Sequence, residues 1–264
     1  PGGAAGVTAV SAEERAKDYT YGIGGMFGYA WIGKGSGNGS GVQLVKCTNY
    51  GDINGNLFTG GIVGSLKGGF ATEAKSIVSI RDSINNGLVL CLVNYKEEDN
   101  RLEGRYFGGI LGHGDGARII NCVNASQYRE DFNDTKKDEL LHGHDVGGII
   151  GYGNNSQLSG CSTRKGSYVL GSDYVGGIAG GLSNVLQEAI TGENSESAGV
   201  QITTNGGYII GNRYVGGIVG KNDGSASTTV ANCINNGVAA GYDRYIGGIV
   251  GYNLSGAGMI SNRN

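Results

Sequence analysis

A seven-residue segment centred on a pair of glycines occurs seven times in this chain. The copies are GIGGMFG (22–28), FTGGIVG (58–64), YFGGILG (106–112), DVGGIIG (145–151), YVGGIAG (174–180), YVGGIVG (214–220) and YIGGIVG (245–251). Self-similarity at intervals of a few tens of residues is the signature of a repeat protein, and it constrains the fold more than any other feature. Each copy reads as one buried strand with an unusual number of glycines.

Two further columns of equivalent residues follow each glycine pair. The first is aliphatic and contains Leu44, Ile80, Ile119, Leu158, Val200, Val230 and Ile260. The second, three residues later, contains Cys47, Ser83, Cys122, Cys161, Thr203, Cys233 and Arg263. The surrounding sequence, as in VANCINNGVAAG (230–241) and LVKCTNYGDING (44–55), alternates short β-branched segments with Asn-Gly and Gly-Asp turns. This pattern predicts two or three short strands in each repeat.

No single repeat can bury its apolar face, so the repeats are expected to stack. We predict an all-β fold, a parallel β-solenoid of about seven coils over residues 21–264. Coils about 4.8 Å apart would give a stack of roughly 34 Å. Ser11 and Glu14 form a capping box that predicts a short helix to about Asp18, within an N-terminal segment of residues 1–20 that caps the first coil.

The glycine pairs are predicted to be structural for two reasons. Corners need a positive φ, and a narrow coil leaves no room for a β-carbon. The residues concerned are Gly24, Gly25, Gly60, Gly61, Gly108, Gly109, Gly147, Gly148, Gly176, Gly177, Gly216, Gly217, Gly247 and Gly248.

Four of the five cysteines, Cys47, Cys122, Cys161 and Cys233, share one repeat position, where Ser83 and Thr203 also occur. Small, weakly polar residues in one column predict reduced, buried and inert thiols that pack as small hydrophobes. Metal ligation by this column is the alternative, although no CxxC spacing is present.

Composition excludes several classes of protein. Glycine contributes 54 residues and proline one, which excludes collagen, and 39% apolar residues provide a core. The chain has 20 basic and 23 acidic residues, so its net charge is slightly negative. Because nucleic-acid binding usually needs an excess of positive charge, no nucleic-acid partner is predicted. The sequence contains no run of 18 apolar residues, so it predicts no membrane-spanning segment. A basic segment followed by an apolar stretch, the pattern of a signal peptide, is not seen at the start of the sequence. No cofactor is predicted, because the phosphate-loop-like Gly28–Lys34 is followed by Gly35 instead of Ser or Thr, and no HExxH zinc motif occurs.

The segments GGIVGKNDG (216–224), VANCINNGVAAG and GGIVGYNLSGAGMISN (247–262) are similar to the GLUG-type glycine-rich repeat. That family occurs in large surface proteins of Gram-positive and gut bacteria and in the non-catalytic part of IgA-specific metallopeptidases. The resemblance extends from about Tyr21 to the last residue. It implies an extracellular, cell-wall-associated module without catalytic residues, although the parent protein could be a peptidase.

Two long excursions depart from the repeat, YKEEDNRLEGRY (95–106) and QYREDFNDTKKDELLHGHD (127–145). Because they leave adjacent coils at the same position, they should emerge side by side and could form a recognition surface. Tolerated insertions are the alternative. The candidate binding residues are Tyr95, Arg101, Arg105, Tyr106, Tyr128, Arg129, His142, His144 and Asp145. No metal site is predicted: His142, His144 and Asp145 could hold an ion, but a five-residue strand of roughly 17 Å should separate them from His113.

An aromatic column precedes the glycine pairs, with Phe58, Tyr106, Tyr174, Tyr214 and Tyr245, interrupted by Gly22 and Asp145. Packing is the favoured role, and stacking on sugar rings is the alternative.

The predicted function is that of a non-catalytic stalk or adhesin on the bacterial surface or in secreted form. Its predicted partners are a host glycan or protein and adjacent domains of a longer chain. A glycan-binding or polysaccharide-degrading β-helix is the alternative, and it would need paired carboxylates from residues such as Glu97, Glu98, Asp99, Asp131 and Asp134. The raw last strand is expected to meet more chain or a partner domain.

Overall fold

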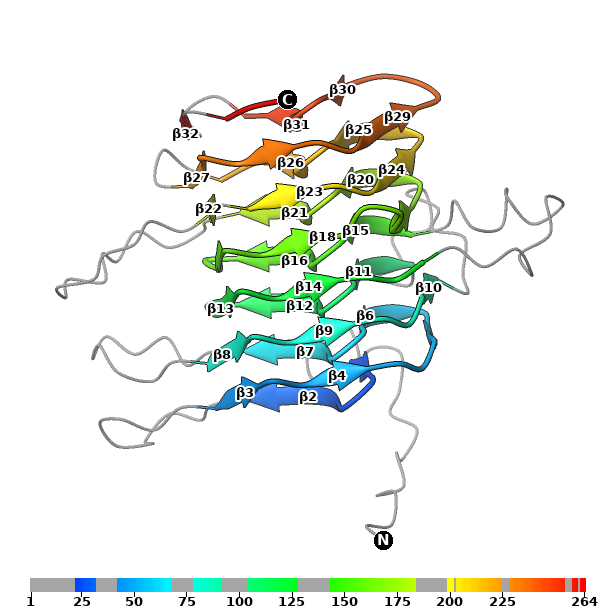
Figure 1. The fold of residues 1–264 in the computed structure, drawn as a ribbon, viewed down its shortest axis with the longest axis vertical. Helices are drawn as coiled ribbons and strands as arrows, with labels where there is room; N and C mark the ends of the chain where they lie inside the picture. The colour runs from blue at the N-terminus through cyan, green and yellow to red at the C-terminus, as the bar shows by residue number, and fades with distance from the viewer. Residues whose placement is uncertain are drawn as a thin grey trace, which may run out of the picture.

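The computed structural model describes residues 22–31, 42–67, 78–91, 104–127, 143–183, 199–201, 203–224, 228–254, 258–260 and 262–264. These residues form 32 strands and no helix, so the described part of the chain is all-β (Figure 1). The helix predicted over residues 11–18, and the whole segment 1–20, lie outside the described residues.

The strands belong to four long sheets and two short ones. Sheet A contains β1 (Ile23–Gly24), β6 (Leu57–Gly60), β11 (Arg105–Gly108), β15 (His144–Gly147), β20 (Asp173–Gly176), β25 (Arg213–Gly216) and β30 (Ile246–Gly247). Sheet B contains β2 (Phe27–Trp31), β7 (Val63–Lys67), β12 (Leu111–Asp115), β16 (Ile150–Asn154), β21 (Ala179–Ser183), β26 (Val219–Asn222) and β31 (Val250–Asn253). Sheet C contains β3 (Gln43–Val45), β8 (Val78–Arg81), β13 (Ala117–Ile120), β17 (Gln157–Ser159), β22 (Gly199–Gln201), β27 (Thr229–Ala231) and β32 (Gly258–Ile260).

Sheet D is built from the short strands that follow the cysteine column. It contains β4 (Thr48–Asn49), β9 (Ile84–Asn85), β14 (Val123–Asn124), β18 (Ser162–Thr163), β23 (Thr204–Asn205) and β28 (Ile234–Asn235). A fifth column of strands is split into sheet E, with β5 (Ile53–Gly55) and β10 (Val89–Cys91), and sheet F, with β19 (Tyr168–Leu170), β24 (Tyr208–Gly211) and β29 (Val238–Gly241).

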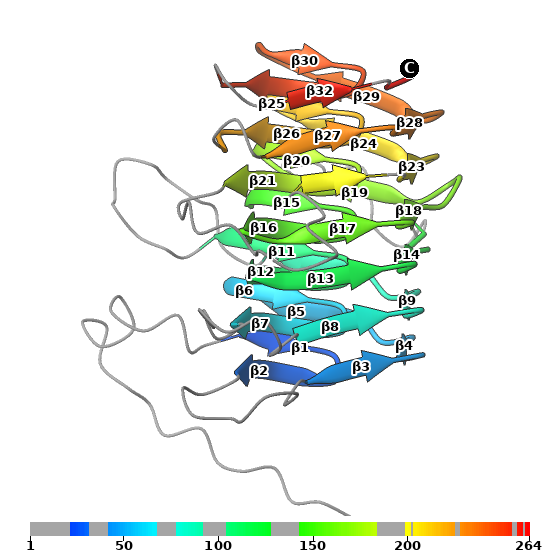
Figure 2. The same ribbon diagram turned by 90° about the vertical axis from the view of Figure 1, so that its left-hand side faces the viewer.

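Each strand pairs in parallel with the equivalent strand of the next repeat. In sheet A, for example, Gly24 is in register with Gly60, Gly60 with Gly108 and Gly108 with Gly147. Sheets A, B and C each hold seven strands, so the repeats form seven stacked layers along the long axis (Figures 1 and 2). This arrangement of parallel strands in stacked sheets is compatible with the predicted solenoid. A layer holds up to five described strands, more than the two or three expected.

The prediction of one continuous strand at each glycine pair is wrong. In the second layer β6 ends at Gly60, the chain turns at Gly61 and Ile62, and β7 begins at Val63. The same strand–turn–strand path recurs in all seven copies. The heptad therefore joins two different sheets instead of lying within one.

The glycine pairs are explained by lack of space and not by a positive φ. A β-carbon on Gly60 would lie less than 3.0 Å from the carbonyl oxygen of Val63, across the turn. A β-carbon on Gly61 would come equally close to the carbonyl oxygen of Gly109 and to the side chain of Asn85. No glycine of any pair adopts a positive φ. The positive-φ corners before the cysteine column are instead occupied by Lys46, Asp82, Asn121, Gly160 and Asn232.

The apolar residues form two clusters. The larger one, which includes Ile62, Leu66, Ile80 and Ile119, fills the space between sheets B and C. The smaller one contains Phe107, Val146, Val169, Val175, Ile209 and Val215, from sheets A and F. The four cysteines of the repeat column are free thiols; Cys122, Cys161 and Cys233 are buried and Cys47 is half-buried.

A column of asparagines runs through the stack at the second residue of the sheet D strands and continues in the last layer at Asn264, beyond sheet D. Its members are Asn49, Asn85, Asn124, Asn205, Asn235 and Asn264, with Thr163 in one layer, and we call it the asparagine ladder. Asn49 Nδ2 donates to Asn85 Oδ1 (2.8 Å), and Asn205 Nδ2 donates to Asn235 Oδ1 (2.8 Å). Thr163 instead donates its hydroxyl to the carbonyl oxygen of Gly177. Each described turn of the glycine pairs thus has a polar side chain of the ladder against it.

Candidate functional site

Four of the predicted binding residues come together on two adjacent strands of sheet A. Arg105 and Tyr106 lie on β11, and His144 and Asp145 lie on β15 in the next layer. The other five, Tyr95, Arg101, Tyr128, Arg129 and His142, lie outside the described residues. The candidate site is therefore built around Arg105, Tyr106, His144 and Asp145.

Asp145 is the buried centre of this group, with 2% of its surface exposed. Arg105 donates to its Oδ2 from Nη2 (3.0 Å) and Nε (3.3 Å), and Nδ1 of His144 lies 2.7 Å from the same oxygen. Burial by itself would raise the pKa of Asp145, but the charge and hydrogen bond of His144, followed by those of Arg105, outweigh it and lower the pKa. The carboxylate is thus ionised and held inside the protein by the Arg105 guanidinium and by its contact with the His144 ring.

Asp145 occupies a position that is aromatic in neighbouring layers. Phe58 and Tyr106 stack with ring centroids 5.2 Å apart, and Tyr214 and Tyr245 stack at 4.8 Å. All described non-glycine members of this column have a positive φ, between 45° for Phe58 and 66° for Tyr106. Phe58 is fully buried and Tyr245 is 47% exposed. The rings pack mainly on one another, which agrees with the favoured packing role.

A second column, from sheet B, faces the first one. It contains Tyr29, Ser65, His113, Tyr152, Gly181, Lys221 and Tyr252. The ring of His113 lies 5.4 Å from that of Tyr106 and 6.0 Å from that of Tyr152. Nζ of Lys221 lies 5.0 Å from the ring of Tyr174. The turn at the glycine pair brings the two columns face to face.

The predicted separation of His113 from the HGHD segment by a strand is wrong. Because the heptad turns, His113 faces the column that contains Asp145, and the charge of Asp145 acts on it. Burial lowers the pKa of His113 to about 4, despite the opposing effect of Asp145. His113 is therefore a neutral, buried ring at neutral pH. Sequence reasoning missed His113, Tyr152 and Lys221 as neighbours of this site, although each lies five residues after the first glycine of its pair.

A second ion pair repeats the arrangement higher in the same column. Asp173 and Arg213 follow Arg105 and His144 in register along sheet A. Nε of Arg213 donates to Oδ1 of Asp173 (3.0 Å), and Asp173 is 6% exposed. Both buried carboxylates are thus engaged by cations of an adjacent layer, an arrangement suited to holding layers together.

The described residues contain no group of three or more His, Cys, Asp or Glu side chains that could hold a metal ion. Nδ1 of His144 is engaged with Asp145, so this histidine could offer a ligand only through Nε2. His142, the third member of the metal site considered from sequence, is outside the described residues.

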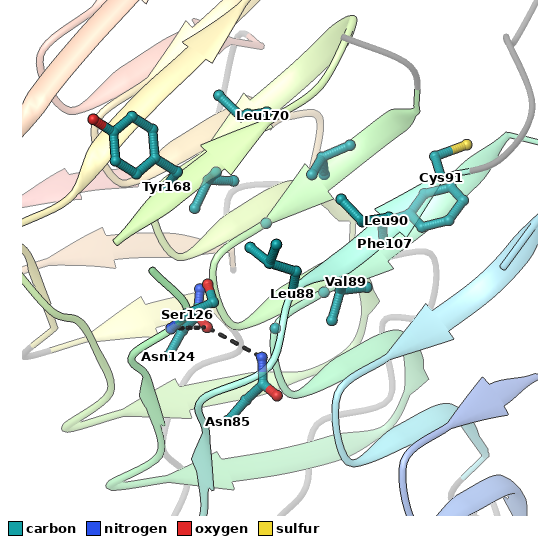
Figure 3. Close-up of a pocket in the computed structure, with 15 residues that line it drawn as sticks. Asn85, Leu88, Val89, Leu90, Cys91, Phe107, Asn124, Ser126, Tyr168 and Leu170 are labelled. Carbon is teal, nitrogen blue, oxygen red and sulfur yellow. Dashed lines mark hydrogen bonds between the residues drawn. The ribbon is translucent and has the colours of Figure 1, made fainter. Parts of the chain in front are cut away.

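A small cavity lies where sheet E ends and sheet F begins (Figure 3). It has a volume of about 50 Å³, and Leu88, Val89, Phe107, Val146 and Val169 form its apolar wall. Asn85 and Asn124, joined by a hydrogen bond of 3.3 Å, lie at one side of it. Ligand pockets usually have about 300–1,000 Å³, so this space fits a water molecule or two better than a ligand.

The ends of the two long excursions meet on one flank. The first leaves the described structure after Cys91 and returns at Gly104, and the second leaves after Gln127 and returns at Gly143. The backbone nitrogen of His144 donates to the carbonyl oxygen of Gly104 (2.7 Å). A β-carbon on Gly143 would lie 3.3 Å from Cβ of Cys91. The return of the second excursion is therefore adjacent to both ends of the first.

Comparison with protein-family models, curated proteins and solved structures finds no match to this chain. Within the described residues, no helix has the length and apolar character needed to cross a membrane.

Proposed function

We propose that this chain is a β-solenoid of seven coils that serves as a non-catalytic repeat module of a bacterial surface or secreted protein. Its role is that of a stalk, with an adhesive patch on the two long excursions. The observation that carries the proposal is the parallel, in-register pairing of equivalent residues through all seven layers. Such a stack lengthens by about 4.8 Å per layer without changing its cross-section, which suits a rigid spacer.

Two further observations support the assignment. The resemblance of segments such as GGIVGKNDG (216–224) to the GLUG-type repeat, which no family model tests, favours an extracellular bacterial protein. The described ionic residues of the candidate site are engaged with one another, as Arg105 and Asp145 are, so they suit a role in stabilising the scaffold. Recognition is therefore assigned to residues 95–103 and 128–142, whose anchoring residues lie on one flank.

A binding assay with two matched variants tests this proposal. In the first variant, residues 95–103 and 128–142 are replaced by short Gly-Ser linkers. In the control variant, residues 68–77 and 184–198, which follow β7 and β21, are replaced in the same way. On arrays of host glycans and extracellular-matrix proteins, we expect binding by the wild type and the control. The first variant should lose binding at least about tenfold with an unchanged melting temperature.

Equal loss in both variants would contradict the proposed patch. Absence of binding by the wild type would remove the adhesive role and leave the stalk. Release of reducing sugar from a polysaccharide by the wild type would contradict a non-catalytic module.

Glycan binding along the stack is a second candidate, which one observation favours. Tyr168 and Tyr208 stack at 5.0 Å on sheet F, and Tyr208 is 41% exposed. Exposed tyrosine rings suit the apolar faces of sugars. Substitution Tyr208→Ala should abolish binding if this candidate is correct and leave it unchanged if the excursions bind.

A further inference from the structure

Five Asn-Gly pairs occur in the chain. The four described pairs are Asn54-Gly55, Asn86-Gly87, Asn205-Gly206 and Asn236-Gly237, whereas Asn38-Gly39 lies outside the described residues. An Asn-Gly pair is prone to react with itself, because glycine has no side chain to hinder the approach of its backbone nitrogen to the asparagine side chain. In a folded protein, a hydrogen bond from that nitrogen opposes the reaction, since it holds the nitrogen in place and keeps its proton on it.

Three of the four described pairs lie in backbone that is paired or hydrogen-bonded at the glycine. Gly55 belongs to β5, which pairs in parallel with β10. The backbone nitrogen of Gly206 donates to the carbonyl oxygen of Thr163 (2.8 Å). The backbone nitrogen of Gly237 donates to Oδ1 of Asn235 (3.1 Å), the local bond that an asparagine forms two residues along the chain. These three pairs are therefore protected.

Asn86-Gly87 differs because the ladder residue Asn85 is turned the other way. Nδ2 of Asn85 donates to the carbonyl oxygen of Gly87 (2.7 Å), and Oδ1 of Asn85 accepts from Asn49 (2.8 Å). Among the described residues, no acceptor receives a hydrogen bond from the backbone nitrogen of Gly87. The nucleophile of this pair is therefore not held by the fold.

The segments 84–87 and 234–237 form a matched pair. Both read Ile-Asn-Asn-Gly, and both lie at the same position of the repeat, where sheet D ends. Asn86 is half-buried and Asn236 is exposed. Exposure alone would therefore favour reaction at Asn236, whereas the hydrogen bond of Gly237 favours reaction at Asn86.

We infer that Asn86 is a self-modification site, at which the side-chain amide is lost by spontaneous deamidation. The backbone nitrogen of Gly87 gives its proton to a base in the solvent and attacks Cγ of Asn86. The new N–Cγ bond forms, the Cγ–Nδ2 bond breaks, and Nδ2 leaves as ammonia after taking a proton from water. Water then opens the cyclic imide at either carbonyl, which gives aspartate or isoaspartate. The net reaction converts an amide and water to a carboxylic acid and ammonia, so it needs no oxidant.

The product alters the contact between the first and second layers. Nδ2 of Asn86 donates to the carbonyl oxygen of Asn49 (3.5 Å), and the backbone nitrogen of Leu88 in the same turn donates to Oδ1 of Asp52 (2.9 Å). A carboxylate at position 86 cannot donate to Asn49, and it adds a negative charge to the turn that binds Asp52. The inference does not depend on whether the chain serves as a stalk.

Peptide mapping of the aged wild-type protein by mass spectrometry tests the inference. The protein is incubated for days in mildly alkaline buffer, both folded and in guanidinium chloride, and each Asn-Gly peptide is followed by its mass rise of about 1 Da. In guanidinium chloride the two Ile-Asn-Asn-Gly segments should react at similar rates. In the folded protein Asn86 should react at least about fivefold faster than Asn236, because a hydrogen-bonded site reacts only when it opens locally.

An equal or faster reaction at Asn236 in the folded protein would overturn the inference. The same conclusion would follow if Asn86 stayed intact in the folded protein while the unfolded chain reacted.

A pair of ladder variants tests the protecting bond itself. Asn235→Ala removes the acceptor of the Gly237 nitrogen, so it should accelerate deamidation of Asn236 at least about fivefold. Asn205→Ala is the matched control, since it removes the ladder side chain of the adjacent layer and leaves the Gly237 bond in place. Equal acceleration in both variants would overturn the inference, because loosening of the stack would then set the rate. If circular dichroism shows that either variant is unfolded, the comparison of Asn86 with Asn236 in the wild type remains decisive.

Discussion

The three glycine positions that all seven heptads share exclude a β-carbon for different local reasons. At Gly60 the obstacle is the carbonyl oxygen across the turn, and at Gly61 it is the next layer and the asparagine ladder. At Gly112, the third glycine of its heptad, the obstacle is the backbone of β6 in the layer below, at Phe58 and Thr59. All three positions are glycine because the atoms that a β-carbon would meet belong to the backbone or to a side chain fixed by hydrogen bonds, and these atoms cannot move away.

Substitution Gly61→Ala is expected to destabilise the fold by about 3 kcal/mol, because the new methyl group meets backbone and the Asn85 side chain with no space to move. Urea unfolding measures the change. Gly51→Ala is the matched control, since the nearest atom to its β-carbon is 3.8 Å away and the site is exposed. Similar midpoints for the two variants would refute the steric explanation.

His113 should make stability fall as the pH drops. Its pKa is about 4 in the folded protein and 6.5 in the unfolded chain, so the unfolded chain binds the proton preferentially. The free energy of unfolding is therefore complete above pH 6.5 and declines between pH 6.5 and 4, by about 2 kcal/mol at pH 5.

The variant His113→Phe retains a ring between Tyr106 and Tyr152 but cannot titrate. Chemical denaturation at pH 7 and pH 5 should show a smaller pH-dependent loss for this variant than for the wild type. Equal losses would place the titration on a group other than His113; Asp115 does not qualify, because burial raises its pKa and acidification would then favour the folded state.

At the scale of elements, the asparagine ladder links sheet D across layers and supports the turns between sheets A and B. Asn85 Nδ2 donates both to Asn124 Oδ1 and to the carbonyl oxygen of Gly87, and Asn85 Oδ1 accepts from Asn49. The Asn85 side chain thus bonds to polar groups of Asn49 in the layer below, Gly87 in its own layer and Asn124 in the layer above. Loss of this side chain leaves these buried groups without that hydrogen bond.

Asn85→Ala should lower stability by about 2–3 kcal/mol, because it leaves buried donors and acceptors unsatisfied. Asn85→Thr should be milder, since Thr163 occupies the same ladder position and donates to a neighbouring carbonyl oxygen. Asn86→Ala, at the adjacent half-buried residue, is the control. Thermal unfolding gives the melting temperatures of the three variants. Equal melting temperatures for Asn85→Ala and Asn86→Ala would rule out this role of the ladder.

At the scale of the whole molecule, the layers are interchangeable units. Val215 is in register with Ile246 and Val219 with Val250, so corresponding residues of the sixth and seventh layers are 31 positions apart (246 − 215 and 250 − 219). Arg244 therefore takes the place of Arg213, one layer higher. Removing 31 residues from this region removes one whole layer.

Deletion of residues 213–243 is expected to leave a folded protein with six layers. Far-UV circular dichroism should retain its β signature, and the urea m value should fall by roughly a tenth because less surface is exposed on unfolding. Deletion of residues 213–228 is the control: of the described strands it removes only β25 and β26, and it joins β24 of sheet F directly to β27 of sheet C. A folded control, or an unfolded first variant, would contradict interchangeable layers.

The sequence alone determined the number of layers, their parallel stacking and the columns of equivalent residues, because a repeat position must meet its counterpart when identical units stack. Glycine spacing, the cysteine column and the aromatic column were all readable on this basis. The two excursions, residues 95–106 and 127–145, were recognisable as departures from the repeat for the same reason.

Only the tertiary structure decided the path of the chain within a layer. In GGIVG the apolar residues are adjacent, so alternation does not reveal that the backbone turns at the second glycine and the Ile and that only the Val begins a strand of another sheet. The contact of His113 with Tyr106 depends on that turn, whereas Arg105 reaches Asp145 because β11 and β15 pair in adjacent layers of sheet A. Contacts between layers follow from repetition, whereas contacts within a layer follow from backbone geometry that repetition does not encode.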